Sequence, residues 1–301
     1  MKDSNFLFPL KEKSKPILKW AGGKTNLLPQ LIKVFPKNFK RYIEPFIGGG
    51  AVFLSLKKGT SAIINDYNEE IFNLYIGVRE NPAEIAKYLD SFSSLYSEEF
   101  YYKLRKEIPE NKYEKMARTI FLNKTGFNGL YRQNSKGDFN VPFGKRLSCP
   151  SLYEWDNLFK VSERLKYAQI LNDDFEMIID QSGLGDFVYC DPPYEPLSIT
   201  SSFNSYNSIG FNRKQQIRLF EACVRASKRG ACVAISNSNS NFILNLYDDF
   251  LINKLFAKRA INSDGNKRGR IEEILVLICE ESYSSFYFNQ DIRNSTECSL
   301  T

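Results

Sequence analysis

The feature that most constrains the fold is a glycine-rich turn between two short apolar stretches. RYIEPF occupies residues 41–46, three glycines stand at 48–50, and SAIIN follows at 61–65. We expect both apolar stretches to be buried strands and AVFLSLKK, residues 51–58, to be a short helix. A strand, a glycine turn, a helix and a second strand in this order predict a βαβ unit of a doubly wound α/β sheet.

Further apolar stretches continue this pattern along the chain. Strands are predicted at QIL (169–171), GDFVYCD (185–191), ACVAIS (231–236) and EEILVLIC (272–279), with a helix at 213–228. Strands that alternate with helices in this way predict one mostly parallel sheet.

The pattern changes in the middle of the chain. Residues 77–165 are rich in Lys, Glu and Tyr and predict helices, followed by an irregular stretch from Lys124 to Pro150. We therefore expect a core domain made of residues 1–76 and 166–301, with a second, mainly helical domain inserted at 77–165. The last twenty residues are polar and are expected to form a tail.

Composition excludes several kinds of site. The sequence contains no histidine, which rules out Ser-His and Cys-His nucleophile pairs and argues against a catalytic zinc site, so we expect no metal. Its six cysteines include no CxxC pair, and Cys190, Cys232 and Cys279 stand in apolar runs, where free thiols pack as small core residues. With no signal peptide and no long apolar span, we expect a reduced, cytoplasmic protein without a membrane partner.

A basic and aromatic segment lies between Arg118 and Arg146. It holds six Lys or Arg residues against a single acid, Asp138, together with five aromatic residues. This composition is typical of a nucleic-acid contact surface, and a solvated loop with a few core aromatics has it as well. Composition alone does not decide between the two.

The stretch LKWAGGKTNLL, residues 18–28, resembles half of a phosphate-binding P-loop. A P-loop needs a glycine five places before Gly23, where this chain has Leu18, and it needs a strand leading into the loop. The approach here, PLKEKSKPI, is charged and broken by proline. These departures argue against a nucleoside triphosphatase.

The glycine turn indicates a different nucleoside ligand. Phe53 stands where a dinucleotide-binding turn has its third glycine, which argues against a nicotinamide cofactor. Asp66 closes the second strand, where an acid commonly accepts hydrogen bonds from ribose hydroxyls. Together these features favour a nucleoside cofactor without a demanding phosphate site, such as S-adenosylmethionine. A tight packing turn followed by a solvated acid remains the alternative.

The stretch DFVYCDPPYEP places a polar loop after a buried strand. Asp191, Pro192, Pro193 and Tyr194 follow the strand at the sheet edge where doubly wound folds bind ligands. Each proline fixes φ near about −65° and lacks a backbone donor, so the loop is stiff and offers acceptors, a carboxylate and an aromatic face. A proline-stiffened turn with no function is the alternative.

Such a loop suits methylation of an amine on a nucleic-acid base. The amine is a poor nucleophile because its lone pair is delocalised into the ring. Acceptors on both amine protons, here the Asp191 carboxylate and the Pro192 carbonyl, draw it toward a nucleophilic geometry and stabilise the positive charge that develops. Tyr194 would stack on the base, and no histidine, metal or covalent intermediate is needed.

At this point the ordered motifs resemble a known family. KWAGGK, EPFIGGGAVF, NDYN, NGLYRQNSKGDFNVPFG and DPPY are similar in sequence and order to Dam-type DNA adenine-N6 methyltransferases, from about Ile17 to Cys279. The resemblance implies a Rossmann-like, S-adenosylmethionine-dependent methyltransferase fold in which the insertion at 77–165 is a target-recognition domain. It also implies that adenine is flipped out of duplex DNA before methylation, with GATC as the target sequence.

The resemblance assigns roles to individual residues. Asp191, Pro192, Pro193 and Tyr194 take the catalytic positions. Asp174 with Phe175 would recognise the cofactor adenine, with Asp173 as a rival for the polar role, and Asp66 would hold the ribose. The cofactor-binding set is Trp20, Lys24, Phe46, Gly48, Gly49, Gly50, Asp66, Asp174, Phe175 and Asp191.

The same resemblance predicts a DNA-reading surface. Arg132 matches an arginine that reads guanine, which is chemically sensible because a guanidinium pairs with guanine N7 and O6. Leu130 and Pro142 match apolar contacts to bases, and lysines touch phosphates. The full predicted DNA-binding set is Lys124, Phe127, Asn128, Leu130, Arg132, Asn134, Lys136, Pro142 and Lys145. In SFNSYNSIGF, Phe203, Tyr206 and Phe211 would stack near the flipped base or serve as core aromatics.

Several alternatives stay open on sequence. They are an adenine methyltransferase with another target sequence, an RNA base methyltransferase, a related enzyme that methylates a protein side-chain amide, and a non-catalytic DNA-binding protein of the same fold. The sequence also leaves open whether a restriction endonuclease acting at the same site is a partner, and which oligomeric state the protein adopts.

Overall fold

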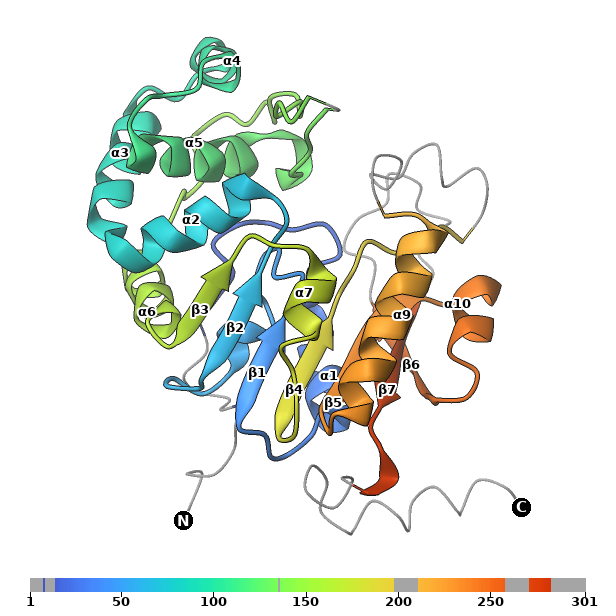
Figure 1. Ribbon diagram of the computed structural model, residues 1–301. Coiled ribbons are helices and arrows are strands. Elements are labelled where there is room, and N and C mark those ends of the chain that lie inside the picture. Colours follow the sequence, from blue (N-terminus) through green and yellow to red (C-terminus); the bar gives the residue numbers. More distant parts are fainter. Residues whose placement is uncertain (1–7, 9–13, 135, 198–210, 258–270, 283–301) are drawn as a thin grey trace.

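The protein is built around one seven-stranded sheet (Figure 1). Its computed structural model describes residues 8, 14–134, 136–197, 211–257 and 271–282. The strand order is β3-β2-β1-β4-β5-β7-β6. In chain order the strands are β1 (Arg41–Glu44), β2 (Ala62–Asn65), β3 (Ala168–Leu171), β4 (Asp186–Cys190), β5 (Cys232–Ser238), β6 (Leu251–Ala257) and β7 (Ile271–Ile278).

Strand direction creates a binding edge. The five strands β1 to β5 run parallel to one another, and β7 runs antiparallel between β5 and β6. The order reverses between β1 and β4, so the chain leaves these two adjacent strands in opposite directions. A ligand site is expected outside the carboxyl ends of strands at such a switch point. The prediction of a doubly wound α/β sheet is confirmed.

Alternate residues of each strand pack on opposite faces of the sheet. Tyr42 and Phe187 belong to one apolar cluster, whereas their neighbours Ile43 and Val188 belong to the other. The first cluster continues into α1 (Leu28–Val34), which follows the short 3₁₀ helix η1 (Lys24–Asn26). The second is covered by α7 (Phe175–Ile179), α9 (Arg213–Lys228) and α10 (Asn241–Leu246) (Figure 1). Both faces of the sheet are therefore closed to water.

Helices gather beyond the β3 side of the sheet (Figure 1). They are α2 (Glu69–Glu80), α3 (Pro82–Ser94), α4 (Glu98–Lys106), α5 (Lys112–Thr125) and α6 (Trp155–Leu165). Asparagine or serine side chains cap the first turns of α2, α3, α4 and α5. Their apolar faces join the cluster on the first face of the sheet, so the domain boundaries near 77 and 165 stay a prediction.

Between α5 and α6 the chain forms a hairpin-like pair of segments, 126–134 and 138–144. We call it the reading hairpin, after the DNA-reading role that the sequence predicts for it. Phe127 N–H donates to Pro142 O over 2.9 Å, and Asn140 N–H donates to Arg132 O over 2.9 Å. The short 3₁₀ helix η3 (Phe127–Gly129) begins it. The irregular stretch expected after Lys124 is thus ordered by backbone pairing.

Two expectations about local structure are wrong. AVFLSLKK forms only the 3₁₀ turn η2 (Phe53–Ser55), because the Ser55 hydroxyl donates to Val52 O over 2.7 Å and the chain extends again at Leu56. Cys232 and Cys279, expected as free thiols, form a disulfide. They face each other because the antiparallel register of β5 and β7 continues to this pair. Cys190 is a buried free thiol, as expected.

The described residues also bear on membranes and metals. No helix among them has the length and apolar character that crossing a bilayer requires. Within the same part of the chain, no three His, Cys, Asp or Glu side chains are arranged to hold a metal ion.

Candidate active site

The turn after β1 is fixed on two sides and covered by a tryptophan. Gly48 has φ +45°, its N–H donates to Asp66 Oδ2 over 2.9 Å, and its carbonyl accepts the Tyr75 hydroxyl over 2.9 Å. A side chain at Gly48 would place its Cβ 2.5 Å from Trp20 Nε1, so only glycine leaves room for the indole. Trp20 also stacks on Tyr131 with ring centroids 5.3 Å apart.

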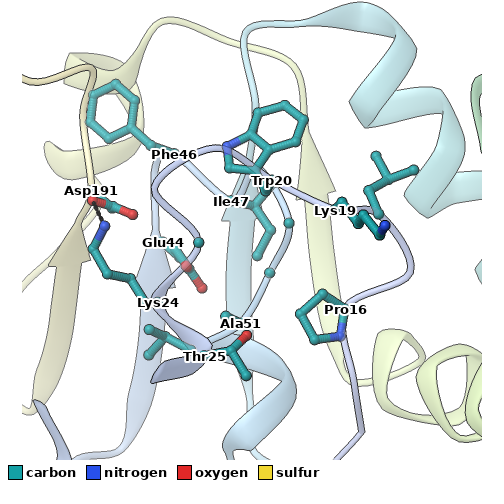
Figure 2. Close-up of a pocket in the computed structure, with 15 residues that line it drawn as sticks. Pro16, Lys19, Trp20, Lys24, Thr25, Glu44, Phe46, Ile47, Ala51 and Asp191 are labelled. Atoms are coloured by element: carbon teal, nitrogen blue, oxygen red, sulfur yellow. Dashed lines mark ion pairs between the residues drawn. The ribbon is translucent and has the colours of Figure 1, made fainter. Parts of the chain in front are cut away.

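Two cavities flank this turn. The first has a volume of about 310 Å³ and is lined by residues that include Trp20, Lys24, Glu44, Phe46, Gly50 and Asp191 (Figure 2). The second has a volume of about 920 Å³, and its lining includes Phe46, Asp66, Asp174, Phe175 and Pro193. Phe46 lines both, so the cavities adjoin at its ring. We call residues 191–194 the DPPY loop. The structure therefore brings together the residues of the glycine turn and of the DPPY loop that the sequence predicts to bind the cofactor.

Aromatic rings form one wall of the second cavity. The Phe46 and Phe175 ring centroids lie 5.4 Å apart, and Phe211 lies 5.6 Å from each of them. Phe211 thus packs against predicted cofactor residues, whereas Phe203 and Tyr206 lie outside the described residues. Flat apolar walls of this kind suit an aromatic base.

Asp191 lies at the end of β4 in an ion pair. Lys24 Nζ stands 2.9 Å from Asp191 Oδ1, and only 3% of the lysine side chain is exposed (Figure 2). The same ammonium donates to Gly22 O over 2.6 Å. Burial raises the pKa of Asp191, and the ammonium of Lys24 limits that rise. Lys24 thus contacts the acid of the DPPY loop directly.

Tyr194 completes this group together with a residue that sequence reasoning did not assign. Its hydroxyl donates to Glu273 Oε2 over 2.8 Å, and Lys24 Nζ lies 4.9 Å from the centre of its ring. Burial and then the neighbouring carboxylates raise the pKa of Tyr194 well above its usual range. The phenol is therefore neutral and serves as a hydrogen-bond donor.

Polar side chains from α9 and β5 hold the DPPY loop in place. Gln216 Nε2 donates to Pro193 O over 2.9 Å, and Asn237 Nδ2 donates to Gln216 Oε1 over 3.0 Å. Asn237 Oδ1 accepts the N–H of Glu195 over 3.3 Å. The loop is stiffened by two prolines within it and by these bonds around it.

Two further carboxyl groups lie close to the turn. Glu44, fully enclosed at the end of β1, accepts the Tyr42 hydroxyl over 2.9 Å, and burial raises its pKa well above the usual range. Burial raises the pKa of Asp66 to about 6, against the opposing effect of the Asn68 and Gly48 N–H groups that it accepts. Asp66 also lines the second cavity.

The two candidates for reading a cofactor base differ in their surroundings. Asp174 lines the second cavity, caps α7 by accepting Glu176 N–H over 2.9 Å, and pairs with Arg218. Asp173 is held by its backbone, since its N–H donates to Asn65 Oδ1 over 2.8 Å and its carbonyl accepts Asn65 Nδ2 over 3.0 Å. Of the two, Asp174 is the one in the lining of the second cavity, and its role toward a cofactor base stays a prediction.

The predicted DNA-binding residues lie on the reading hairpin and its flanks. Arg132 Nε donates to Asn140 Oδ1 over 2.6 Å, which holds the guanidinium beside the opposite segment. Asn128 adopts φ +54°, a left-handed conformation that asparagine tolerates. Exposed side chains are those of Phe127, Asn128, Arg132, Asn134, Lys136, Pro142 and Lys145, whereas Leu130 and Lys124 are partly buried.

One buried amide joins the reading hairpin to the segment that carries Lys19 and Trp20. Asn123, fully buried near the end of α5, accepts Lys19 N–H over 2.8 Å and donates to Lys19 O over 2.9 Å and Gly129 O over 3.1 Å. A second hydrogen bond joins the reading hairpin to the start of α2, where Asn68 Nδ2 donates to Gln133 Oε1 over 2.8 Å. Sequence reasoning missed both links, because a polar residue in a helix carries no mark of its distant partner.

Comparison with known proteins agrees with this geometry. A family model described as D12 class N6 adenine-specific DNA methyltransferase matches residues 20–261. The chain belongs to this family. The methyltransferase is 45% identical over 285 residues to the Type II methyltransferase M.MjaIII of Methanocaldococcus jannaschii, a match that covers 87% of this chain and 98% of the relative. It is 32% identical over 273 residues to the DNA adenine methylase of Escherichia coli (strain K12), covering 88% and 96%.

Membership decides several of the alternatives left open on sequence. The methyltransferase is an adenine-specific DNA methyltransferase with an α/β methyltransferase fold, so the resemblance to Dam-type enzymes is confirmed. Its nucleic-acid substrate is DNA. Membership alone does not decide the roles of individual residues.

Proposed function

We propose that the methyltransferase transfers a methyl group from S-adenosylmethionine to adenine N6 of GATC in duplex DNA, with the adenine flipped into the site. The observation that carries this proposal is the position of Asp191. It stands at the end of β4 and lines the smaller cavity, with Lys24 paired to its carboxylate and Tyr194 three residues further along the loop. The carboxylate of Asp191 and the ring of Tyr194 therefore lie close together, both in contact with Lys24.

The residues around the cavities fit S-adenosylmethionine. Asp66 offers a carboxylate to ribose hydroxyls, and Phe46 and Phe175 offer apolar walls to an adenine. The close approach of Trp20 to the glycine turn shapes the smaller cavity for the amino-acid part. When bound, this cofactor supplies a methyl group on a positively charged sulfur.

Within the DPPY loop, the acceptors act on the target amine. The Asp191 carboxylate and the Pro192 carbonyl accept hydrogen bonds from its two N–H groups, which localises the nitrogen lone pair and stabilises the positive charge that builds on nitrogen. The Pro193 carbonyl is not assigned to the target amine, because it already accepts a hydrogen bond from Gln216. Tyr194 packs against the base, and the extruded adenine leaves the stack at a cost of a few kcal/mol.

The insertion at 77–165 recognises the DNA sequence that is methylated. We assign guanine reading to Arg132 and apolar base contacts to Leu130 and Pro142, all on the reading hairpin. Lys136 and Lys145 are exposed nearby and suit phosphates, which bind without sequence choice. Lys124 is half-buried, and both burial and Lys19 lower its pKa, so its phosphate contact would need the side chain to extend.

The target sequence and biological setting follow from the same proposal. The loop NGLYRQNSKGDFNVPFG resembles that of Dam-type enzymes, which supports GATC. The name Type II methyltransferase carried by M.MjaIII and by M1.LlaDCHI of Lactococcus lactis supports pairing with a restriction endonuclease that acts at the same site. An enzyme with genomic DNA as its substrate works where that DNA lies, which we propose to be the cytoplasm.

Transfer of tritiated methyl groups in vitro tests the proposal. Duplex oligonucleotides with GATC, the same duplexes with another base in place of adenine, duplexes with a scrambled site, and a folded RNA are compared. We expect incorporation into the GATC duplex alone. Equal incorporation into the scrambled duplex would refute GATC as the target sequence. Incorporation into RNA alone would refute duplex DNA as the substrate.

A further inference from the structure

The strand β7 brings a second carboxylate to the DPPY loop. Because β7 is antiparallel, its first residues lie at the edge where the parallel strands end, and Glu273 pairs in register with Ser238 at the end of β5. The Glu273 side chain is 13% exposed. Its Oε2 accepts the Tyr194 hydroxyl over 2.8 Å and lies 3.7 Å from Lys24 Nζ.

The buried ammonium of Lys24 therefore stands between two carboxylates. It is closer to Asp191, at 2.9 Å, than to Glu273, at 3.7 Å. A buried charge without a counter-charge is strongly destabilising, so the ammonium must stay paired throughout the reaction. If Asp191 were its only partner, the same carboxylate would have to neutralise Lys24 and stabilise the charge on the target amine.

A second counter-charge removes this conflict. We propose that Glu273 is a positioning residue of the methyltransferase. It holds the Lys24 ammonium while Asp191 accepts a hydrogen bond from the N–H of the target amine, and it fixes the Tyr194 ring by accepting the hydrogen bond of its hydroxyl. The inference rests on the proposed function of Asp191. Glu273 itself does not touch the base; it acts through Lys24 and Tyr194.

The neighbouring glutamate provides a matched control. Glu272 belongs to the same strand, but successive side chains of a strand point to opposite faces. Its Oε1 accepts Asn239 Nδ2 over 3.0 Å and lies 2.7 Å from Lys254 Nζ, away from the DPPY loop. Glu272→Gln removes the same charge from the same strand without touching Lys24 or Tyr194.

Two substitutions separate the two roles of Glu273. Glu273→Gln keeps an oxygen for the Tyr194 hydroxyl but removes the charge that faces Lys24. Glu273→Ala removes both. Each variant is assayed for kcat and KM on duplex DNA and for the emission of 2-aminopurine placed at the target adenine, which reports stacking of the flipped base independently of methyl transfer.

We expect Glu273→Gln to lower kcat by about tenfold or more, the effect of losing one hydrogen bond or ion pair to a charged group, with KM and emission near wild-type values. Glu273→Ala should lower kcat further and raise the emission, because Tyr194 loses its hydrogen bond to Glu273 and its ring is held less closely against the base. Glu272→Gln should match wild type in all three readouts.

Wild-type kcat and emission in both Glu273 variants would overturn the inference. If the alanine variant fails to fold, the isosteric glutamine variant still decides the role of the charge, and Tyr194→Phe tests the hydrogen bond from its other side. A wild-type enzyme that transfers no methyl group to DNA would instead refute the proposed function. The two failures are therefore distinguishable.

Discussion

Replacing Gly48 by alanine tests how the turn and Trp20 shape the smaller cavity. An alanine at φ +45° costs about 1–2 kcal/mol in backbone strain. Its Cβ would also lie 2.5 Å from Trp20 Nε1. The turn cannot yield because Asp66 and Tyr75 hold it from both sides. The indole must move instead, at an overpacking cost of about 1–3 kcal/mol.

The sum for Gly48→Ala is about 2–5 kcal/mol, a large part of the roughly 5–15 kcal/mol by which domains are stable. We expect this loss in urea unfolding. Because Trp20 lines the smaller cavity, its displacement should also raise the Kd for S-adenosylmethionine about tenfold or more, equivalent to about 1.4 kcal/mol.

Gly59→Ala is the matched control. Gly59 has φ +90°, and apart from Gly59 itself and its two chain neighbours no atom of the described residues lies within 4 Å of the point that an added Cβ would occupy, so alanine there meets backbone strain alone. We expect a loss of about 1–2 kcal/mol in unfolding and an unchanged Kd for the cofactor. Equal stability of the two variants, together with wild-type cofactor binding by Gly48→Ala, would refute the assigned contact between the turn and Trp20.

Three further outcomes follow from the site. Asp191→Ala should abolish methyl transfer while gel-shift affinity for DNA stays near wild type; transfer at the wild-type rate would contradict the role of the carboxylate. Arg132→Ala should lose about 1–3 kcal/mol of discrimination at one base pair, measured on duplexes with single substitutions. Lys136→Ala should instead weaken binding to DNA of every sequence by the same factor. Unchanged preference in the arginine variant would remove its assignment. Burial raises the pKa of Asp66 to about 6. If the ionised carboxylate accepts the ribose hydroxyls, as proposed, cofactor affinity should fall as pH drops below about 6. Asp66→Asn should flatten that pH dependence, and a persisting one would point to another group.

The central strands could be predicted because they are buried on both faces. Such strands appear as short continuous apolar runs, as at 61–65 and 231–236, and the helix predicted at 213–228 has the same bounds as α9. The strand β6 (Leu251–Ala257) was missed because LINKLFA mixes polar and apolar residues at the sheet edge. The disulfide was missed because its partners are 47 residues apart and meet only through strand register.

The same reason explains which parts of the candidate site could be predicted from the sequence and which could not. The DPPY loop and the glycine turn are contiguous in sequence, and their backbone restrictions are visible in proline and glycine themselves. The partners of these elements come from distant segments, as with Tyr194 and Glu273, which are 79 residues apart. Two glutamates at the start of EEILVLIC were the available signal, but only the antiparallel direction of β7 shows which end of the sheet they reach.

Mapping of modified bases in genomic DNA tests the central claim most directly. The methyltransferase is expressed in a bacterial host that lacks adenine methylation, and the native DNA is sequenced for N6-methyladenine. We predict marks on the adenine of GATC, and their loss with Asp191→Ala. Marks on adenine in another sequence would contradict the assignments of Arg132 and Leu130, and unmarked DNA from a host that contains the folded, cofactor-binding enzyme would contradict the proposed activity.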